Sequence, residues 1–303
     1  MEKVLILGSN GYLGSNLALK MKEEGFEVLL SGRSSHSLLS NVKYVQCDLL
    51  DSKQVEKLFA NKVDYVYFFC GVTGNAEESF ASSEKFLLGN ELILLNVLNE
   101  IRKLTNRPKI IFPSSRLVYN GGERILLSES AEFNPKTIYS VNKLSCEYYL
   151  KMYSKNFGIN YSIFRIALPY STNLLNSDIS YGVMSDLMLK AKNGEDLDVF
   201  GDGEQNVNLI HIDDLIEIII KASVNEESSN ECYNIGGPDV YQIREVLEMI
   251  SKAYKVKCNY INWPKELRNS DQGHLILNSS KVLNLIDYSF KNSFVSWLNQ
   301  NVQ

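Results

Sequence analysis

The chain has 303 residues, a mass of 34.4 kDa and a formal net charge of -5 at pH 7. At about 150 residues per domain, this length predicts two domains and a large core. The acidic balance, with no run of Lys and Arg longer than a pair, excludes the positive field that nucleic acid or an anionic membrane requires. No apolar stretch approaches the roughly 20 residues of a membrane helix, and the chain opens in a core strand rather than a signal peptide. We therefore expect a cytoplasmic protein with no membrane or nucleic-acid partner.

Cysteine and histidine usage gives no sign of a disulfide framework or a metal site. The five cysteines are odd in number, widely spaced and mostly in apolar runs, and no CxxC or HxxxH spacing occurs. We expect these thiols to be buried, to act as small hydrophobic residues and to bind no metal.

Short runs of β-branched and aromatic residues alternate with longer amphipathic runs over the first two thirds of the chain. This alternation is typical of βαβ units, and it predicts an α/β fold with a doubly wound, right-handed parallel sheet. The expected strands lie at 4–7, 27–30, 44–46, 65–69, 110–112 and 161–164, and the expected helices at 12–24, 54–59, 84–102 and 139–156.

After residue 166 the alternation loosens. Helices are expected at 183–192, 213–222, 243–253 and 281–285, separated by short strands and by turns rich in Gly, Asn and Asp. We interpret residues 1–166 as a first domain and residues 167–303 as a smaller C-terminal α/β lobe that binds the substrate. The boundary is soft, because chains of this kind often weave between lobes.

A glycine-rich turn follows the first expected strand and precedes the first expected helix. Such a turn brings backbone N–H groups up to the pyrophosphate of a dinucleotide. Glycine turns also occur as purely structural features of α/β proteins, but this position between strand and helix favours dinucleotide binding. The first domain is therefore predicted to be a Rossmann-type dinucleotide-binding domain, whose loop contacts the cofactor through Gly8, Asn10, Gly11, Tyr12, Leu13 and Gly14.

The residues that end the second strand choose between the two nicotinamide cofactors. NAD needs an acceptor for its 2′-hydroxyl, whereas NADP needs cations for its 2′-phosphate. Here Gly32 stands where an acid would be, and Arg33 follows with Ser34 beside it. A guanidinium can bind a phosphate through two hydrogen bonds, so NADP is favoured and NAD is the alternative. A solvated loop arginine with no ligand is the other interpretation of Arg33.

Asp48 follows the third expected strand and has two possible roles. It could accept a hydrogen bond from the adenine amino group, or it could cap the next helix. Asp51 is an equally good candidate for the cap, so the residues alone leave this choice open.

Tyr139 and Lys143 lie four residues apart on an expected helix and therefore share one face. A free phenol has a pKa near 10, and a neighbouring ammonium favours the phenolate, so such a tyrosine can give or take a proton. Ser114 and Ser115 follow the strand at 110–112, at the sheet edge where open α/β sheets bind ligands. Either hydroxyl could hold a substrate oxygen against Tyr139 or simply cap the strand end. YxxxK alone could also be an ordinary surface pair, and the glycine turn is what favours chemistry.

Together these motifs resemble the extended short-chain dehydrogenase/reductases, the NAD-dependent epimerase/dehydratase group that works mainly on nucleotide sugars. The resemblance covers essentially the whole chain. The matched pieces are, in order, Gly8-x-x-Gly11-x-x-Gly14, Asp48-Leu49, the helix beginning at Asn90, Ser114-Ser115-Arg116-Leu117-Val118-Tyr119, Tyr139-x-x-x-Lys143, Phe164-Arg165, Gly201-Asp202-Gly203 and His211-Ile212-Asp213-Asp214.

The resemblance implies roles for individual residues. The family places its catalytic Ser or Thr three residues before the Val of the Val-Tyr pair, which selects Ser115 over Ser114. It also implies that Lys143 binds the nicotinamide ribose and that Asn90 helps to order the site. Family dimers usually pack their two long helices against the copies, so a homodimer through a four-helix bundle is expected. The expected cofactor contacts outside the glycine loop are Arg33, Ser34, Asp48, Leu49, Cys70, Gly71, Asn90, Tyr139 and Lys143.

Departures from the family pattern narrow the reaction. Dehydratases of the group carry an Asp-Glu pair after the catalytic hydroxyl, where this chain has Arg116 and Leu117. The 3,5-epimerase/reductases carry a Cys at the position of Leu117. Elimination of water and ring epimerisation by that route are therefore disfavoured.

Two contacts to the nucleotide diphosphate are also replaced. Leu168 stands where the family usually has Asn, and Val207 where it has an Arg. A second family Arg is matched in spacing by Arg268, although a surface loop would also explain that residue. The substrate is thus a nucleotide sugar held differently or a smaller carbonyl compound, and the residues expected to shape its pocket are Thr73, Arg116, Leu168 and Arg268.

The favoured function is an NADP-dependent ketoreductase that acts on a nucleotide-linked keto-(deoxy)sugar. In it the nicotinamide delivers hydride, Tyr139 protonates the oxygen, Ser115 orients it and Lys143 tunes the phenol. The alternative is an NAD-dependent nucleotide-sugar 4-epimerase, which would use the same three residues. A dinucleotide-binding sensor without turnover is a third possibility, but it has no chemical need for the complete set.

Overall fold

The computed structural model describes residues 2–122, 126–171 and 182–302. The chain divides into two compact units, and each unit is assembled from three segments. Unit 1 comprises Met1–Ser115, Thr137–Arg165 and Ile216–Tyr233, and unit 2 comprises Arg116–Lys136, Ile166–Leu215 and Asn234–Gln303.

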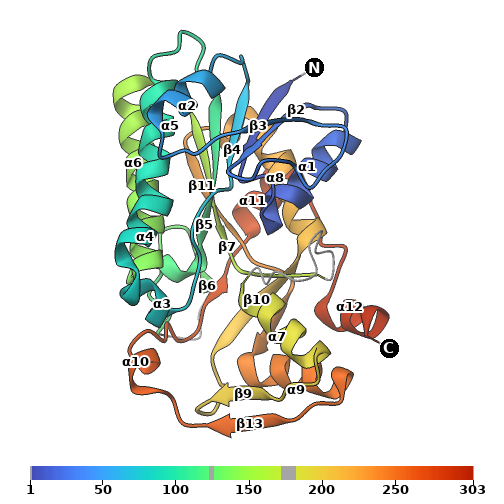
Figure 1. The fold of residues 1–303 in the computed structure, drawn as a ribbon. Helices are drawn as coiled ribbons and strands as arrows, with labels where there is room; N and C mark the ends of the chain where they lie inside the picture. The colour runs from blue at the N-terminus through green and yellow to red at the C-terminus, as the bar shows by residue number, and fades with distance from the viewer. Residues whose placement is uncertain (1, 123–125, 172–181, 303) are drawn as a thin grey trace. The chain divides into compact units, whose positions relative to one another are not determined.

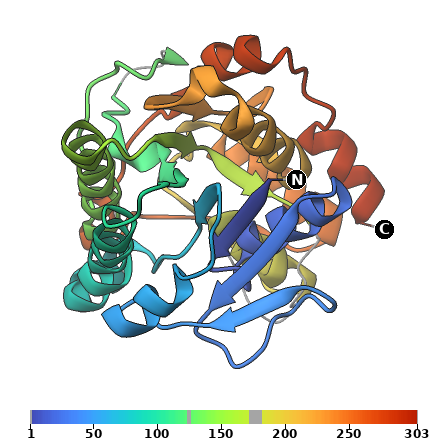
Figure 2. The ribbon, with the colours of Figure 1, turned by 90° about the horizontal axis from the view of Figure 1, so that it is seen from above.

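Unit 1 is built on a seven-stranded sheet with the order β11-β7-β5-β4-β1-β2-β3 (Figures 1 and 2). The pairings β3–β2, β2–β1, β1–β4 and β4–β5 are all parallel. The strand order reverses between β1 and β4, so the doubly wound sheet expected from the sequence is confirmed. The strands are β1 Lys3–Leu7, β2 Glu27–Gly32, β3 Lys43–Gln46, β4 Tyr65–Phe68, β5 Lys109–Ser115, β7 Tyr161–Ile166 and β11 Glu231–Ile235.

Helices cover both faces of this sheet, with α2, α5 and α6 on one face and α1 and α8 on the other (Figure 1). Because both faces are covered, the central strands are largely apolar, and β1 is buried from its second residue to its last. The helices are α1 Tyr12–Glu23, α2 Ser52–Leu58, α3 Ala76–Ala81, α4 Ser83–Leu87, α5 Ile93–Ile101, α6 Ile138–Phe157 and α8 Ile212–Val224, with a 3₁₀ turn at Glu226–Ser228.

The core on the α2, α5 and α6 side follows the expected periodicities. Leu5 and Leu7, two residues apart on β1, belong to the same buried cluster as Leu94, Val97 and Leu98 of α5. Each of these side chains is essentially removed from water. A buried leucine of this kind contributes about 1.5–3 kcal/mol of transfer free energy, so this layer fixes the sheet that carries the strand ends.

The helix expected at 84–102 is interrupted by a π turn at Leu88–Leu92, which separates α4 from α5. A π turn inserts one residue into a helix, and such insertions often mark functional sites. It buries Asn90, whose main-chain oxygen accepts a bond of 3.5 Å from the Cys146 thiol on α6. The simple 3.6-residue period therefore gave the wrong geometry at this position.

Unit 2 contains three small sheets, with the orders β12-β10-β8, β13-β9 and β14-β6. Its core includes Tyr170, Phe294 and Trp297, whose ring centroids lie 5.0–6.0 Å from one another. The strands are β6 Leu126–Leu127, β8 Leu168–Tyr170, β9 Leu197–Phe200, β10 Asn206–His211, β12 Asp239–Gln242, β13 Cys258–Ile261 and β14 Ile276–Leu277. The helices are α7 Val183–Lys192, α9 Ile243–Tyr254, α10 Lys265–Arg268, α11 Ser280–Ile286 and α12 Phe294–Asn301, with a 3₁₀ turn at Arg116–Val118.

None of the five cysteines is joined to another by a disulfide. Cys47 and Cys146 are buried as expected, whereas Cys70, Cys232 and Cys258 are only partly buried, which corrects the expectation that the thiols are core residues. Within the described ranges, no helix combines the length and the apolar character that crossing a membrane would need.

Candidate functional site

The glycine loop joins β1 to α1 and lies directly against the end of β4. Gly8 has a φ of +80°, and a Cβ there would lie 2.6 Å from the Phe69 carbonyl oxygen. The N–H groups of Gly8 and Ser9 donate to the Ser31 carbonyl at 2.9 and 3.2 Å, and the Gly11 N–H donates to Gly8 at 2.9 Å. Only glycine fits this turn, because it combines a positive φ with backbone packed against the position of the missing side chain.

The N-terminus of α1 presents polar backbone at this loop. Gly11 is the N-cap and makes no side-chain capping bond. The first N–H groups of a helix have no intrahelical partner and carry the positive end of its dipole. The 12-residue helix therefore offers donors to an anion such as a pyrophosphate.

A cavity of about 230 Å³ lies beside the loop, at the carboxyl ends of β1, β2, β3 and β4. The Ser31 hydroxyl in its wall is buried and has no hydrogen-bond partner among the described residues. A buried polar atom without a partner is costly, and a polar ligand would satisfy it. The narrow glycine turn, the N-terminus of α1 and this hydroxyl together fit a dinucleotide.

The structure places the expected cofactor residues in two groups. Those that line the cavity are Gly8, Gly11, Arg33, Asp48, Leu49, Cys70 and Gly71. Those outside its lining are Asn10, Tyr12, Leu13, Gly14, Ser34, Asn90, Tyr139 and Lys143. Further lining residues that the sequence did not single out are Leu7, Ser31, Gly32, Cys47, Leu50, Phe69, Val72, Gly89 and Ile93. Four of these further residues, Leu7, Gly32, Cys47 and Phe69, end or directly follow a strand, and that position was the signal that could have identified them.

The two roles open to Asp48 and Asp51 separate in the structure. Asp51 is the N-cap of α2 and accepts from the Lys53 and Gln54 N–H groups at 2.9 and 3.3 Å. Asp48 instead lines the cavity, where its Oδ1 accepts from the Leu50 N–H at 3.0 Å. The cap is therefore supplied by Asp51, and the Asp48 carboxylate faces the space where a cofactor would bind.

Asn90 orders the loop that follows β4. Its side-chain amide exchanges two bonds with Val72, accepting from the N–H at 3.0 Å and donating to the carbonyl at 3.1 Å. A Cβ on Gly71 would lie 2.8 Å from the Asn90 Oδ1, so the loop approaches the amide closely. Asn90 thus acts on one wall of the cavity through the backbone of residues 71–72.

Ser115, Tyr139 and Lys143 meet at the end of β5. Ser115 is the last residue of β5, and its hydroxyl hydrogen-bonds the phenol of Tyr139. Thr137 caps α6 through a capping box with Ser140, which fixes the first helical turn that carries Tyr139. One turn later, the Lys143 Nζ donates to the Pro113 carbonyl at 2.7 Å and lies 5.8 Å from the Tyr139 ring centroid.

Burial controls the proton affinities in this group. It raises the pKa of Tyr139 to about 12, against the opposing effect of the Ser115 hydrogen bond. It lowers the pKa of Lys143 to about 8, although the charge of Glu147 favours the ammonium. At neutral pH the phenol therefore holds its proton and the lysine is charged, which suits a tyrosine that donates a proton.

Ser114 has a different task from its neighbour. Its hydroxyl donates to the Glu147 Oε1 at 2.6 Å, and Glu147 also receives two bonds from Arg165 at 2.9 and 2.6 Å. All three side chains are buried. Ser114 is thus committed to a structural ion pair, and Ser115 is the serine that contacts Tyr139.

The residues expected to shape a substrate pocket differ in their exposure to solvent. Thr73 is exposed in the loop after β4 of unit 1. Within unit 2, burial lowers the pKa of Arg116 to about 10 against the opposing charge of Asp271, and Arg268 is exposed at the end of α10. Leu168 and Val207 are buried in the core of unit 2. The last two positions therefore supply packing where the family pattern has polar groups.

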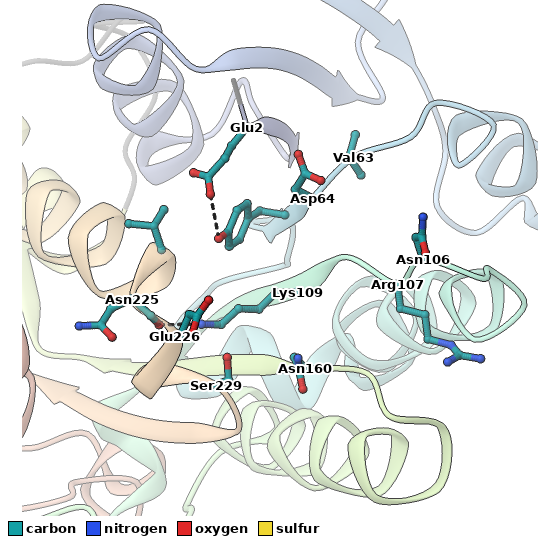
Figure 3. Close-up of a pocket in the computed structure, with 12 residues that line it drawn as sticks. Glu2, Val63, Asp64, Asn106, Arg107, Lys109, Asn160, Asn225, Glu226 and Ser229 are labelled. Carbon is teal, nitrogen blue, oxygen red and sulfur yellow. Dashed lines mark hydrogen bonds between the residues drawn. The ribbon is translucent and has the colours of Figure 1, made fainter.

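A second cavity, of about 480 Å³, lies at the opposite edge of the sheet, among residues that precede β1, β4 and β7 (Figure 3). Lys109, the first residue of β5, reaches into it with a pKa that burial lowers to about 8. Its Nζ donates to the Ser223 carbonyl, the Asn225 carbonyl and the Ser228 hydroxyl at 2.7–3.4 Å. Because the ammonium has three donors, these bonds use all of its hydrogen-bonding capacity.

No group of three or more His, Cys, Asp or Glu within the described ranges is arranged to hold a metal ion.

Comparisons with known proteins agree with this geometry. Residues 4–236 match the NAD dependent epimerase/dehydratase family. The chain is 26% identical over 263 residues to dTDP-4-dehydro-6-deoxy-D-allose reductase from a Streptomyces species, covering 82% of this chain and 79% of that protein. It is 24% identical over 315 residues to UDP-glucose 4-epimerase from Lactobacillus helveticus, covering 97% and 93%. A solved structure of UDP-glucose 4-epimerase from Thermotoga maritima, bound to UDP-glucose, has the same fold with a TM-score of 0.87 at 22% identity, covering 99% of this chain and 97% of that one.

Proposed function

Because this chain belongs to the NAD-dependent epimerase/dehydratase family, whose members are NAD(P)-dependent enzymes of the extended short-chain dehydrogenase/reductase type, we propose that it is an NADP-dependent reductase of a nucleotide-linked keto-(deoxy)sugar. The observation that carries the proposal is the Ser115–Tyr139 hydrogen bond beside the Lys143 ammonium. The similarity to the Streptomyces reductase supports the substrate class.

The reaction adds one hydride and one proton to a carbonyl group. When bound, the nicotinamide cofactor supplies the hydride to the carbonyl carbon. Tyr139 gives its phenolic proton to the carbonyl oxygen, which becomes the product hydroxyl. Ser115 holds that oxygen by a hydrogen bond, and the Lys143 ammonium stabilises the phenolate that Tyr139 becomes. The phenol recovers its proton from solvent before the next turnover.

The cavity residues support NADP as the cofactor. The glycine loop and the α1 N-terminus would hold the pyrophosphate, and Asp48 would face the adenine. Arg33 lines the same cavity and is the only Lys or Arg that does so within the described part of the chain. A reductase releases its cofactor at every turnover and must bind a new one. A site for the 2′-phosphate would let it select NADP over NAD each time.

The substrate is expected to be held differently from the usual family member. Arg116 replaces the acid that dehydratases place after the catalytic hydroxyl, so the chain has no carboxyl there to eliminate water. Leu168 and Val207 pack in the core of unit 2 and cannot supply the two polar diphosphate contacts of the family pattern. We assign the remaining substrate contacts to Thr73, Arg116 and Arg268.

A 4-epimerase with retained NAD is the second candidate. The similarity to UDP-glucose 4-epimerase over 97% of the chain favours it, and the same three residues could carry out its proton transfers. An NAD-dependent epimerase would need no 2′-phosphate site, so this candidate gives Arg33 no role in cofactor binding.

Cofactor exchange separates the two candidates. The purified protein is examined for retained nucleotide by absorbance and mass spectrometry, and the apo protein is titrated with NADPH and NADH. Exchangeable NADPH with a Kd about tenfold or more below that of NADH supports the reductase. Tightly retained NAD that does not exchange would overturn the reductase and favour the epimerase.

We also propose that the enzyme is a homodimer that acts in the cytoplasm. The exposed residues Val141, Tyr148 and Met152 form a stripe along α6, and Leu87 and Leu92 are exposed on the neighbouring helical segment. Exposed apolar stripes on adjacent helices suit a four-helix interface between two copies. Five cysteines without a disulfide are typical of a reducing compartment.

A further inference from the structure

The loop that follows β2 is held in one shape by side chains from several elements. The Gln46 side chain, at the end of β3, donates to the Arg33 carbonyl at 2.9 Å. The Tyr44 hydroxyl, also on β3, donates to the Ser34 carbonyl at 2.7 Å. Two successive carbonyls around the cationic residue are thereby fixed from one neighbouring strand.

Asn10 fixes the same loop from the opposite direction. Its side chain donates to the His36 carbonyl at 2.9 Å and accepts from the Leu38 N–H at 3.1 Å. This pair of bonds connects the glycine turn to the loop after β2. The predicted contact of Asn10 with the cofactor stays a prediction, and in the structure its side-chain amide bonds residues 36 and 38 of the loop.

The Tyr44 hydroxyl lies close to the position at which an NAD-type site would place its acid. A Cβ on Gly32 would lie 3.2 Å from the Tyr44 hydroxyl oxygen, closer than an ordinary contact. An aspartate at position 32 would therefore press against the phenol. In this chain β2 ends in Gly32, which has no side chain, and the Tyr44 hydroxyl donates a hydrogen bond to the Ser34 carbonyl instead.

We propose that Tyr44, Gln46 and Asn10 are positioning residues for NADP specificity, which hold residues 33–38 in the form that binds the 2′-phosphate. This inference rests on the proposed NADP dependence. Loops generally lose conformational entropy when they bind a ligand, and a loop that is already fixed avoids that cost. Arg33 and the Ser34 hydroxyl then meet the phosphate in a preset arrangement, and an NAD ribose without the phosphate gains nothing from it.

The test compares two nucleotides that differ only in the 2′-phosphate. Adenosine 2′,5′-bisphosphate and 5′-AMP are titrated into the apo protein by calorimetry, so the readout is binding and needs no turnover. The variants are Tyr44→Phe and Gln46→Leu, each of which removes one side-chain bond to a carbonyl, and Arg33→Ala, which removes the cation. Tyr65→Phe is the matched control, since the Tyr65 hydroxyl bonds Glu2 at the opposite edge of the sheet.

The wild type is expected to bind the bisphosphate about tenfold or more tightly than 5′-AMP, and Arg33→Ala is expected to abolish that ratio. Tyr44→Phe and Gln46→Leu should each lower the ratio about three- to tenfold with 5′-AMP affinity unchanged, and Tyr65→Phe should leave both affinities unchanged.

Two results would overturn the inference, and they differ from each other. A wild-type ratio near one would remove the NADP assignment and the positioning role with it. A high ratio that Arg33→Ala abolishes, but that Tyr44→Phe and Gln46→Leu leave intact, would keep the NADP assignment and refute the positioning role.

Discussion

The two serines at the end of β5 have different partners. Ser115 hydrogen-bonds Tyr139, whereas Ser114 donates to the buried Glu147. The motif in the sequence contains both hydroxyls, and the resemblance to the family selects Ser115 from its spacing to the Val-Tyr pair. The structure adds the physical difference, because Ser114 is bonded to a carboxylate that lies 33 residues further along the chain.

This division of labour predicts opposite phenotypes for two alanine variants. Ser115→Ala should lower kcat by about 10²-fold or more while the urea unfolding midpoint stays near that of the wild type. Ser114→Ala should lower the unfolding free energy by about 1–2 kcal/mol, because Glu147 loses a buried donor, and should leave kcat within a few-fold. Steady-state kinetics and urea denaturation on the same preparations provide both readouts. Equal losses of kcat in the two variants would contradict the assignment.

The lowered pKa of Lys143 predicts how activity depends on pH. Its ammonium is charged below about pH 8 and is lost as the pH rises through that value. The pKa of Tyr139, at about 12, keeps the phenol protonated across this range, so titration of the tyrosine does not contribute to the pH profile. For carbonyl reduction, kcat/KM should be level from pH 6 to 7.5 and should fall about tenfold per pH unit above pH 8. A profile that stays level to pH 10 would show that the charge on Lys143 is not required.

At the scale of elements, α6 and β7 are joined by a buried ion pair. Arg165 on β7 donates two bonds to Glu147 on α6, and both side chains are essentially inaccessible to water. A buried charge that loses its partner is far more costly than a surface charge that does so. This pair therefore fixes the helix that carries Tyr139 and Lys143 against the sheet.

Removing one charge of the pair is expected to destabilise unit 1. Glu147→Gln should lower the unfolding free energy by about 3 kcal/mol or more, because the Arg165 guanidinium would stay buried without its carboxylate. Glu24→Gln is the control, since Glu24 forms an exposed pair with Lys20 and its loss should cost less than about 0.5 kcal/mol. Urea denaturation measures both. Similar costs for the two variants would refute the view that the buried pair anchors α6.

Elements with a strong local pattern were predictable, and those set by tertiary packing were not. The strands β1, β2, β3, β4, β5 and β7 lie where their apolar runs indicate, because a buried parallel strand needs such a run. The π turn at Leu88–Leu92 was missed, since one inserted residue barely changes the local periodicity. β11 was missed as well, because its short run Glu231–Ile235 becomes a strand only by pairing beside β7. Within the site, the glycine turn and Arg33 were evident, whereas the bonds of Asn10 to the loop at 36–38 come from packing.

At the scale of the whole molecule, the exposed stripe on α6 predicts the oligomeric state. Tyr148 and Met152 are more than half exposed, and they share a helix face with Val141. We expect a dimer by size-exclusion chromatography with light scattering, and a monomer for the variant Tyr148→Asp/Met152→Asp. Val295→Asp is the control, because it places a charge on an exposed apolar residue of α12 and should leave the dimer intact. A wild type that is monomeric at all concentrations would contradict the proposed interface.

The central claim is that Tyr139 and an exchangeable NADPH together reduce a keto sugar. The most direct measurement follows NADPH oxidation with a dTDP-4-keto-6-deoxy sugar as substrate, and compares nicotinamide consumed with hydroxyl product formed. The account predicts one NADPH oxidised per product, a kcat/KM with NADH that is lower by about tenfold or more, and a Tyr139→Phe variant that binds NADPH but loses about 10²–10⁴-fold in kcat. Interconversion of two nucleotide sugars with no net change in nicotinamide, or a Tyr139→Phe variant with wild-type turnover, would contradict it.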